Sequence, residues 1–237
     1  MWKEKLVTFA FLFVLLLGTV AADGSVILIT HRSDLNESNE LDWDYFGPPF
    51  TQIPQDFQFN FGLFAVDGSF ATGPGERLDE GNGWTGNFAI GDRLAWTNAN
   101  GPLTFTFFDP VQGAGAQIET SSFGAFTAQI KAFDGDTLLG AFLENGNSQP
   151  TEDGSAIFIG VKDEVRDITS IEFSILSCTG DCSDFAINLV SIRTFIPPDV
   201  PEPASLLLLS SAFLAVIGNV RKRSARIGRK RLGAFLT

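Results

Sequence analysis

The sequence predicts an all-β protein, a jelly-roll-like antiparallel sandwich, with a hydrophobic helix near the C-terminus. Three observations predict it. Apolar and polar residues alternate in many short segments, Asp-Gly and Asn-Gly pairs separate these segments, and the 237 residues include 24 Phe and 24 Gly. Alternation with a period of two is typical of strands with one buried face, and Gly supplies the turns between them. About ten short strands at this spacing favour a sandwich.

The two ends of the chain differ in charge from its middle. Residues 23–200 hold 7 Lys and Arg against 26 Asp and Glu, a net charge of −19, whereas both ends are positive. An acidic region of this kind repels phosphates, so nucleic acid is not expected as a partner. We predict five parts: a signal peptide at 1–22, an acidic β-sandwich domain at 23–195, a Pro-rich linker at 196–205, a transmembrane segment at 206–220 and a basic cytoplasmic tail at 221–237.

The first part has the pattern of a secretion signal. Two lysines precede the apolar run LVTFAFLFVLLL at 6–17, and small residues follow it at Val20 and Ala22. A cleaved signal is favoured over a permanent membrane helix because the run is short and ends in small residues. We expect signal peptidase to cut between Ala22 and Asp23.

Alternation predicts the strands of the acidic domain in order. The clearest segments are 57–63, 103–107, 126–133, 171–175 and a last strand that begins at Phe185. In the last strand the buried phase changes at Val190, which predicts a bulge or a bend.

Turn residues predict how these strands are connected. Asp134-Gly135-Asp136 joins 125–133 to 137–142 as a hairpin. Asn145-Gly146-Asn147 and Asp153-Gly154-Ser155 are predicted to bound the next strand, 156–161.

Cys178 and Cys182 are the two cysteines of the chain. A zinc site wants about four ligands, and the chain has one His, so these cysteines are not expected to bind zinc. In an oxidising compartment they would form a small disulfide loop; two free structural thiols are the alternative.

The C-terminal part combines three features in order. Pro201-Glu202-Pro203 is followed by an uncharged apolar run at 206–220 and then by a basic run that begins at Arg221. The apolar run would extend roughly 22 Å as a helix. Its basic flank places the tail in the cytoplasm, so the acidic domain lies outside the inner membrane.

This ordered triplet resembles the PEP-CTERM sorting signal of Gram-negative bacteria. The resemblance implies recognition by an exosortase, a membrane-embedded cysteine transpeptidase, with cleavage near Pro201-Glu202-Pro203 and loss of the tail. The two prolines keep the backbone around Glu202 extended and free of helix. A plain C-terminal membrane anchor is the alternative.

The region from Trp84 to Ile192 is also similar to a domain often found upstream of this signal. The similar segments are 87–92, 115–118, 124–130, 154–160 and 184–188. This resemblance implies a jelly-roll sandwich and carries no activity.

The sequence contains no catalytic motif. His31, the single histidine, precedes Ser33 and Asp34 in one run, and neighbours in an extended segment point in alternating directions rather than converging. A surface histidine at a strand end is the preferred interpretation. A glycosidase pair needs two carboxylates across a cleft, and no motif singles out a pair among the acidic residues.

Calcium is a better-supported chemical hypothesis than catalysis, because carboxylates in loops are the hard oxygen ligands that Ca²⁺ prefers. The candidate ligands are Asp42, Asp44 and Asp184, with further acidic groups at 134–136, 163–167 and 181. No segment matches an EF-hand loop. Ordinary turn residues that cap their own backbone are the preferred alternative, so no cofactor is predicted.

Four aromatic residues could form a platform that stacks on sugars: Trp43, Tyr45, Trp84 and Trp96. Trp84 is the best placed, because it lies in the loop-like stretch 81–86. Core packing is the commoner role for Trp in a small sandwich and is the preferred interpretation of these residues.

Together these features predict an exported, non-enzymatic protein of the cell surface or extracellular matrix. Its precursor would be held in the inner membrane transiently, and the resemblance implies an envelope linked with exopolysaccharide. A carbohydrate-binding module acting on that exopolysaccharide is the second hypothesis, and a polysaccharide-active hydrolase is the third.

Overall fold

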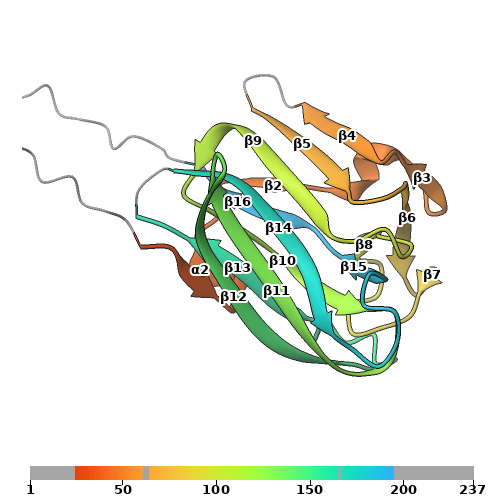
Figure 1. Ribbon diagram of the computed structural model, residues 1–237. Coiled ribbons are helices and arrows are strands. Elements are labelled where there is room, and N and C mark those ends of the chain that lie inside the picture. Colours follow the sequence, from red (N-terminus) through yellow and green to blue (C-terminus); the bar gives the residue numbers. More distant parts are fainter. Residues whose placement is uncertain (1–24, 61–63, 165–166, 195–237) are drawn as a thin grey trace, which may run out of the picture. The chain divides into compact units, whose positions relative to one another are not determined.

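Two β-sheets face each other in the computed structural model, which describes residues 25–60, 64–164 and 167–194 (Figure 1). The larger sheet has the strand order β1 (Ile27–Ile29), β13 (Ile157–Lys162), β10 (Gly113–Thr120), β15 (Phe185–Ile187), β8 (Arg93–Trp96), β6 (Gly75–Glu80) and β3 (Thr51–Ile53). In the same sheet β16 (Val190–Arg193) pairs with β10 and with β2 (Asn39–Leu41), and β7 (Gly83–Trp84) lies parallel to β6.

The smaller sheet is antiparallel throughout. Its order is β12 (Thr137–Ser148), β11 (Gly124–Asp134), β14 (Ile168–Ser177), β9 (Leu103–Val111), β5 (Ala65–Phe70) and β4 (Asp56–Asn60). Two short helical segments, α2 (Arg32–Leu35) and η1 (Trp43–Phe46), complete the described elements. The prediction of an all-β protein with antiparallel sheets is confirmed.

The main core lies between the sheets and is built from the apolar half of each alternating strand. Trp43 is fully buried, and its ring packs against Phe57, Phe59 and Phe105. The indole Nε1 of Trp43 donates a hydrogen bond of 2.9 Å to the carbonyl oxygen of Asn188. Such a bond removes the cost of burying the polar edge of the ring.

A second, smaller core lies on the other face of the larger sheet. Leu94 and Ala186 belong to it, whereas their neighbours Ala95 and Ile187 belong to the main core, as alternation requires. Trp84 and Phe88 cover this face from the segment that follows β6. The larger sheet is therefore buried on both faces in this region.

The predicted hairpin at Asp134-Gly135-Asp136 is confirmed. Asp134 pairs with Thr137, and Gly135 adopts a φ of 54°, which is a left-handed conformation that Gly tolerates without strain.

The predicted turn at Asn145-Gly146-Asn147 is wrong, because β12 continues to Ser148. Gly146 lies opposite Phe126 in the β11–β12 pair. A Cβ atom at Gly146 would lie 2.2 Å from the ring of Phe126, so the absent side chain makes room for that ring. The glycine marks a close contact within a strand and not a turn.

The predicted phase change near Val190 appears as a break between β15 and β16. Both strands pair with β10, and Asn188 and Leu189 separate them. The backbone amide of Asn188 still reaches the carbonyl oxygen of Gln117 at 3.2 Å. The break is therefore a local interruption within one sheet.

Several predictions fall outside the described residues. These are the signal peptide and its cleavage site at Ala22–Asp23, the linker, the Pro201-Glu202-Pro203 motif, the apolar run at 206–220 and the basic tail. Within the described ranges, none of the helices has the length and apolar character needed to span a membrane.

Candidate functional site

Polar side chains cross the outward face of the smaller sheet in register. Gln58 on β4 lies opposite Asp67 on β5, Asp67 lies opposite Thr106 on β9, and Thr106 lies opposite Ser170 on β14. Alternation puts all four on this face, because residues next to each of them along its own strand are buried on the core side. The result is a row of polar groups that runs across four strands.

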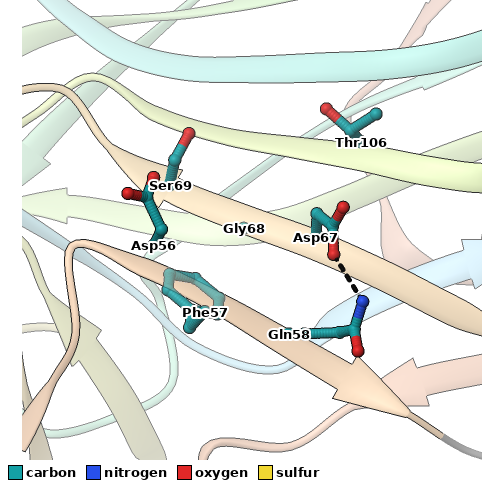
Figure 2. Close-up of a pocket in the computed structure, with 7 residues that line it drawn as sticks. All are labelled: Asp56, Phe57, Gln58, Asp67, Gly68, Ser69 and Thr106. Atoms are coloured by element: carbon teal, nitrogen blue, oxygen red, sulfur yellow. Dashed lines mark hydrogen bonds between the residues drawn. The ribbon is translucent and has the colours of Figure 1, made fainter.

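A groove of about 510 Å³ lies over one end of this row (Figure 2). Its lining residues are Asp56, Phe57, Gln58, Asp67, Gly68, Ser69 and Thr106. The amide Nε2 of Gln58 donates a hydrogen bond of 2.8 Å to Oδ1 of Asp67. That bond orients the two side chains, and neither the carbonyl oxygen of Gln58 nor Oδ2 of Asp67 takes part in it.

Gly68 and Phe57 form the part of the sheet that lies under the groove, and both are directed to the core side. Gly68 lies opposite Phe57, whose ring occupies the space that a side chain at position 68 would need. A Cβ atom there would lie 2.1 Å from that ring. The floor therefore consists of backbone with an aromatic ring directly beneath it.

An exposed aromatic ring lies beside the groove. Phe108 follows Thr106 by two residues on β9, and the alternating burial of the strand puts both on the outward face. The side chain of Phe108 is 66% exposed. Single exposed apolar side chains are common on protein surfaces, so Phe108 is a candidate contact because of its position beside the polar groups of the groove and not because of its exposure alone.

The groove carries negative charge. Asp56 and Asp67 contribute two carboxylates, and none of the lining residues in the described structure is basic. On the same face, Lys131 is engaged by Glu172 at 2.7 Å, further across the sheet. The groove therefore favours neutral or cationic groups over anionic ones.

A second hollow, of about 550 Å³, opens beside the end of β1. Its lining includes His31, Arg32, Gln117 and Glu144. His31 is exposed and occupies the residue before α2, so it is the surface histidine at a strand end that the sequence favours.

Arg32 in this hollow is committed to structural contacts. Its guanidinium donates to the carbonyl oxygen of Leu189 and to the side chains of Ser191 and Asn188, and it lies 5.1 Å from the ring centre of Phe158. Burial lowers the pKa of Arg32. These bonds fix the backbone where β15 ends and β16 begins. Because the guanidinium is already engaged, the second hollow is a weaker candidate binding site than the groove.

Two buried carboxylates were not anticipated from the sequence. Glu80 and Glu119 are 2% and 1% exposed. The amide of Gly86 donates to Glu80 at 2.8 Å, and the next amide, of Asn87, donates to Glu119 at 2.7 Å. Burial raises the pKa of Glu80 to about 7 and raises that of Glu119 as well. They anchor the segment after β7 to the larger sheet.

Trp84 does not offer its face to a ligand. Its side chain is 6% exposed and packs with Phe88 and Leu94 in the second core. The expectation of glycan contact at Trp84 is therefore corrected: the Gly-rich loop folds back over the sheet and buries the ring. Trp43 is also fully buried, and the Nε1 of Trp96 donates to Asp184.

The predicted calcium ligands are not brought together. Asp42 and Asp44 both contact Arg93, the latter at 3.5 Å, and Asp42 also caps η1 by accepting a bond from the amide of Asp44. Asp184 instead accepts hydrogen bonds from Ser121 and Trp96. In the part of the chain that the structure describes, no three His, Cys, Asp or Glu side chains form a group that could hold a metal ion.

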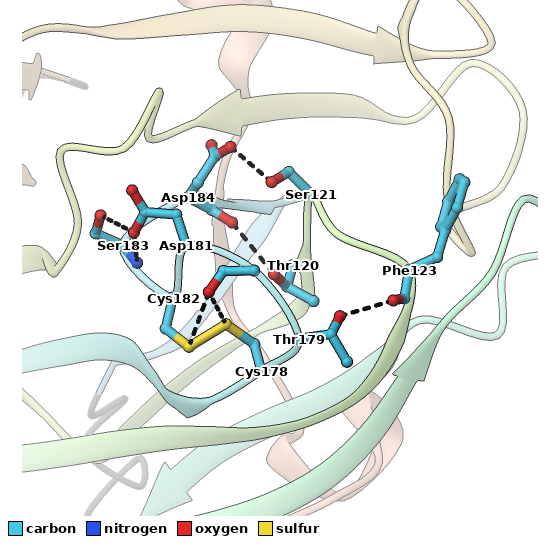
Figure 3. The surroundings of a disulfide bond; sticks show 10 residues. Thr120, Ser121, Phe123, Cys178, Thr179, Asp181, Cys182, Ser183 and Asp184 are labelled. Atoms are coloured by element: carbon cyan, nitrogen blue, oxygen red, sulfur yellow. Dashed lines mark hydrogen bonds between the residues drawn. A yellow bond between two sulfur atoms is a disulfide. The ribbon is translucent and has the colours of Figure 1, made fainter.

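Cys178 and Cys182 form a disulfide, with Cα atoms 5.7 Å apart (Figure 3). Two hydrogen bonds attach this region to the connection between β10 and β11: Thr179 in the loop donates at 2.8 Å to the carbonyl oxygen of Phe123, and Asp184, just after the loop, accepts at 2.6 Å from Ser121. Hydrogen bonds from Ser183 lower the pKa of Asp181 within the loop. The disulfide and these bonds stabilise the connection between β14 and β15.

Fold and groove together define a β-sandwich with a polar groove on one sheet face. No protein-family model matches the sequence, and no curated protein matches it either.

Proposed function

We propose that this protein is an exported, non-enzymatic component of the cell surface or extracellular matrix. In this proposal signal peptidase removes residues 1–22, and an exosortase acts at Pro201-Glu202-Pro203 after the precursor has been held in the inner membrane. The acidic domain, a sandwich of jelly-roll type, is the part that remains outside the cell.

The observation that carries the proposal is the order of signals along the chain. A secretion signal, an acidic domain, a proline motif, an apolar run and a basic end follow one another as the topology requires. The disulfide between Cys178 and Cys182 is in keeping with an oxidising compartment. The charge of −19 in residues 23–200 favours solubility there.

A non-enzymatic role is favoured by where the unusual carboxyl groups lie. The acid of a glycosidase must hold a proton near neutral pH and face its substrate. Glu80 and Glu119 have raised pKa values, but both are buried beneath the segment after β7. The pKa values of Glu40 and Asp167 are raised as well, and neither residue lines the groove. The groove residue Asp67 is instead held by Gln58.

Carbohydrate binding is the second candidate function, and the groove on the smaller sheet favours it. It presents hydrogen-bonding groups from β4, β5 and β9 on a rigid surface. A matrix protein with such a groove would bind exopolysaccharide at the cell surface, either as the precursor or as the mature form.

Intact-mass analysis of the protein recovered from the cell surface and medium tests the leading proposal. We expect a species that begins at Asp23 and ends near Pro203. The double variant Pro201→Ala, Pro203→Ala should lose the N-terminal signal normally and keep its C-terminal tail. Wild-type protein that begins at Met1 or ends at Thr237 would contradict the proposal.

A further inference from the structure

We infer that the groove over β4, β5 and β9 binds a neutral polysaccharide chain, with Asp56 and Asp67 accepting its hydroxyl groups and Phe108 stacking on one of its rings. The inference rests on the second candidate function above, and it adds the site and the class of ligand.

The hydrogen-bonding inventory of the groove is rich in acceptors. Asp56 and Asp67 contribute carboxylate oxygens, and the carbonyl of Gln58 adds another acceptor because its amide already donates to Asp67. Ser69 and Thr106 supply hydroxyls that donate or accept. A ligand with many hydroxyl groups matches this set, because each hydroxyl can donate to a carboxylate and so form a charge-assisted hydrogen bond.

The charge of the groove selects against acidic ligands. Its two carboxylates lie in a domain that is already strongly negative, and no basic residue lines the groove in the described chain. A uronate, sulfate or phosphate group would therefore meet repulsion both on approach and on contact. Neutral sugars meet no such barrier.

Phe108 supplies the apolar contact that sugar binding requires. Its ring is 66% exposed on the same face as Thr106 and two residues away along β9. The faces of pyranose rings carry C–H groups that pack on aromatic rings, while the ring edges carry the hydroxyls. A sugar stacked on Phe108 would thus turn its hydroxyls towards Thr106 and Asp67.

The row of polar residues suits a chain rather than a single sugar. Beyond Thr106 it continues to Ser170 on β14, and Ser170 lies opposite Phe133 on β11. With strands about 4.8 Å apart, the four polar positions from Gln58 to Ser170 span about 14 Å, and Phe133 lies about 5 Å beyond them. That length accommodates a short oligosaccharide laid across the sheet.

Titration calorimetry with the full chain tests this inference, in a detergent that has no sugar headgroup. The probes are the hexasaccharides of cellulose, xylan and mannan, with hexagalacturonate as the acidic counterpart. We expect at least one neutral hexasaccharide to bind, hexagalacturonate not to bind, and EDTA to leave the affinity unchanged. Failure of all three neutral probes, or preference for the acidic one, would overturn the inference.

Two variants locate the binding site. Phe108→Ala and Asp67→Ala should each weaken binding about tenfold, which corresponds to about 1.4 kcal/mol, because one removes the stacking contact and the other a bond to a charged acceptor. The matched controls are Phe123→Ala, an exposed ring on the disulfide side, and Asp136→Asn in the β11–β12 turn. These should bind as the wild type does, and equal losses in variants and controls would refute the site.

Three outcomes separate this inference from the proposals above. Binding that disappears in EDTA would indicate a bridging cation and overturn direct contact. Release of new reducing ends from the bound hexasaccharide would overturn the non-enzymatic role. Since the measurement uses the unprocessed chain, a failure of binding leaves the intact-mass result unaffected, and the reverse also holds.

Discussion

The carboxyl group of Glu80 shows how much a single buried side chain can couple stability to pH. It is 2% exposed, and burial raises its pKa from an ordinary value of 4.5 to about 7. The folded state therefore keeps a proton between pH 4.5 and 7 that the unfolded chain releases. Because the native state binds more protons in this window, the free energy of unfolding falls as pH rises through it.

We predict that Glu80→Gln flattens this pH dependence. Gln has no proton to lose and can still accept the bond from the amide of Gly86, so the variant should gain about 3 kcal/mol over the wild type between pH 4.5 and pH 8. Urea unfolding at pH 4.5, 6, 7 and 8 measures this difference. Glu76→Gln on the same strand is the control and should leave the wild-type slope intact; parallel profiles for Glu80→Gln would contradict the prediction.

The residue scale also shows which site residues could be anticipated. Period-two alternation does put Asp56, Gln58, Asp67 and Thr106 on outward faces, but they come from strands as far apart in the sequence as β4 and β9. These residues become neighbours only through the order of the strands in the sheet, and alternation along the sequence does not predict that order. The Gly-rich stretch around Trp84 looks exposed in sequence and so suggests a ligand contact, whereas bonds to Glu80 and Glu119 hold the loop against the sheet and the ring lies in the core.

At the scale of elements, the β11–β12 hairpin depends on a close contact across its strands. Gly146 faces the ring of Phe126, and a Cβ atom would lie 2.2 Å from it. We predict that Gly146→Ala destabilises the protein by about 2 kcal/mol, because the ring has to move within a packed core. Chemical denaturation of purified protein measures the loss.

A double-mutant cycle tests the cause of that loss. Phe126→Leu shortens the opposing side chain, so Gly146→Ala should cost at least about 1 kcal/mol less in the Phe126→Leu background than in the wild type. The exposed neighbour Asn147→Ala is the control for strand propensity and should stay within about 0.5 kcal/mol. Additive effects of Gly146→Ala and Phe126→Leu would show that the contact is not the cause.

Elements also differ in how well the sequence predicts them. The Asp134-Gly135-Asp136 hairpin was predictable because its signal is local: two alternating segments and a turn that favours Gly. Asn145-Gly146-Asn147 carries the same local signal, yet it lies within a strand, because a tertiary contact with Phe126 decides the role of its glycine. At Gly146 the packing of the Phe126 ring, and not the turn preference of Asn-Gly, determines the local structure.

At the scale of the whole molecule, Trp43 joins the parts of the sandwich. Its ring packs on Phe57 and Phe59 of the smaller sheet, and its Nε1 donates to Asn188 at the break between β15 and β16 of the larger one. Asn188 in turn accepts from Arg32 and donates to Gln117. The 43–46 segment thus closes the sandwich although it contributes no strand to either sheet.

We therefore predict that the described domain unfolds as one cooperative unit and that Trp43 determines much of its stability. Trp43→Phe should cost about 2 kcal/mol, from the lost hydrogen bond and lost volume, and Trp43→Ala about 4 kcal/mol. Guanidinium unfolding followed by far-UV circular dichroism and by fluorescence should give coincident curves for the wild type and Trp43→Phe. Phe123→Ala, an exposed ring, should shift neither curve by more than about 0.5 kcal/mol. If instead the two signals separate in Trp43→Phe, the two sheets fold independently, and the bridging role assigned to Trp43 is wrong.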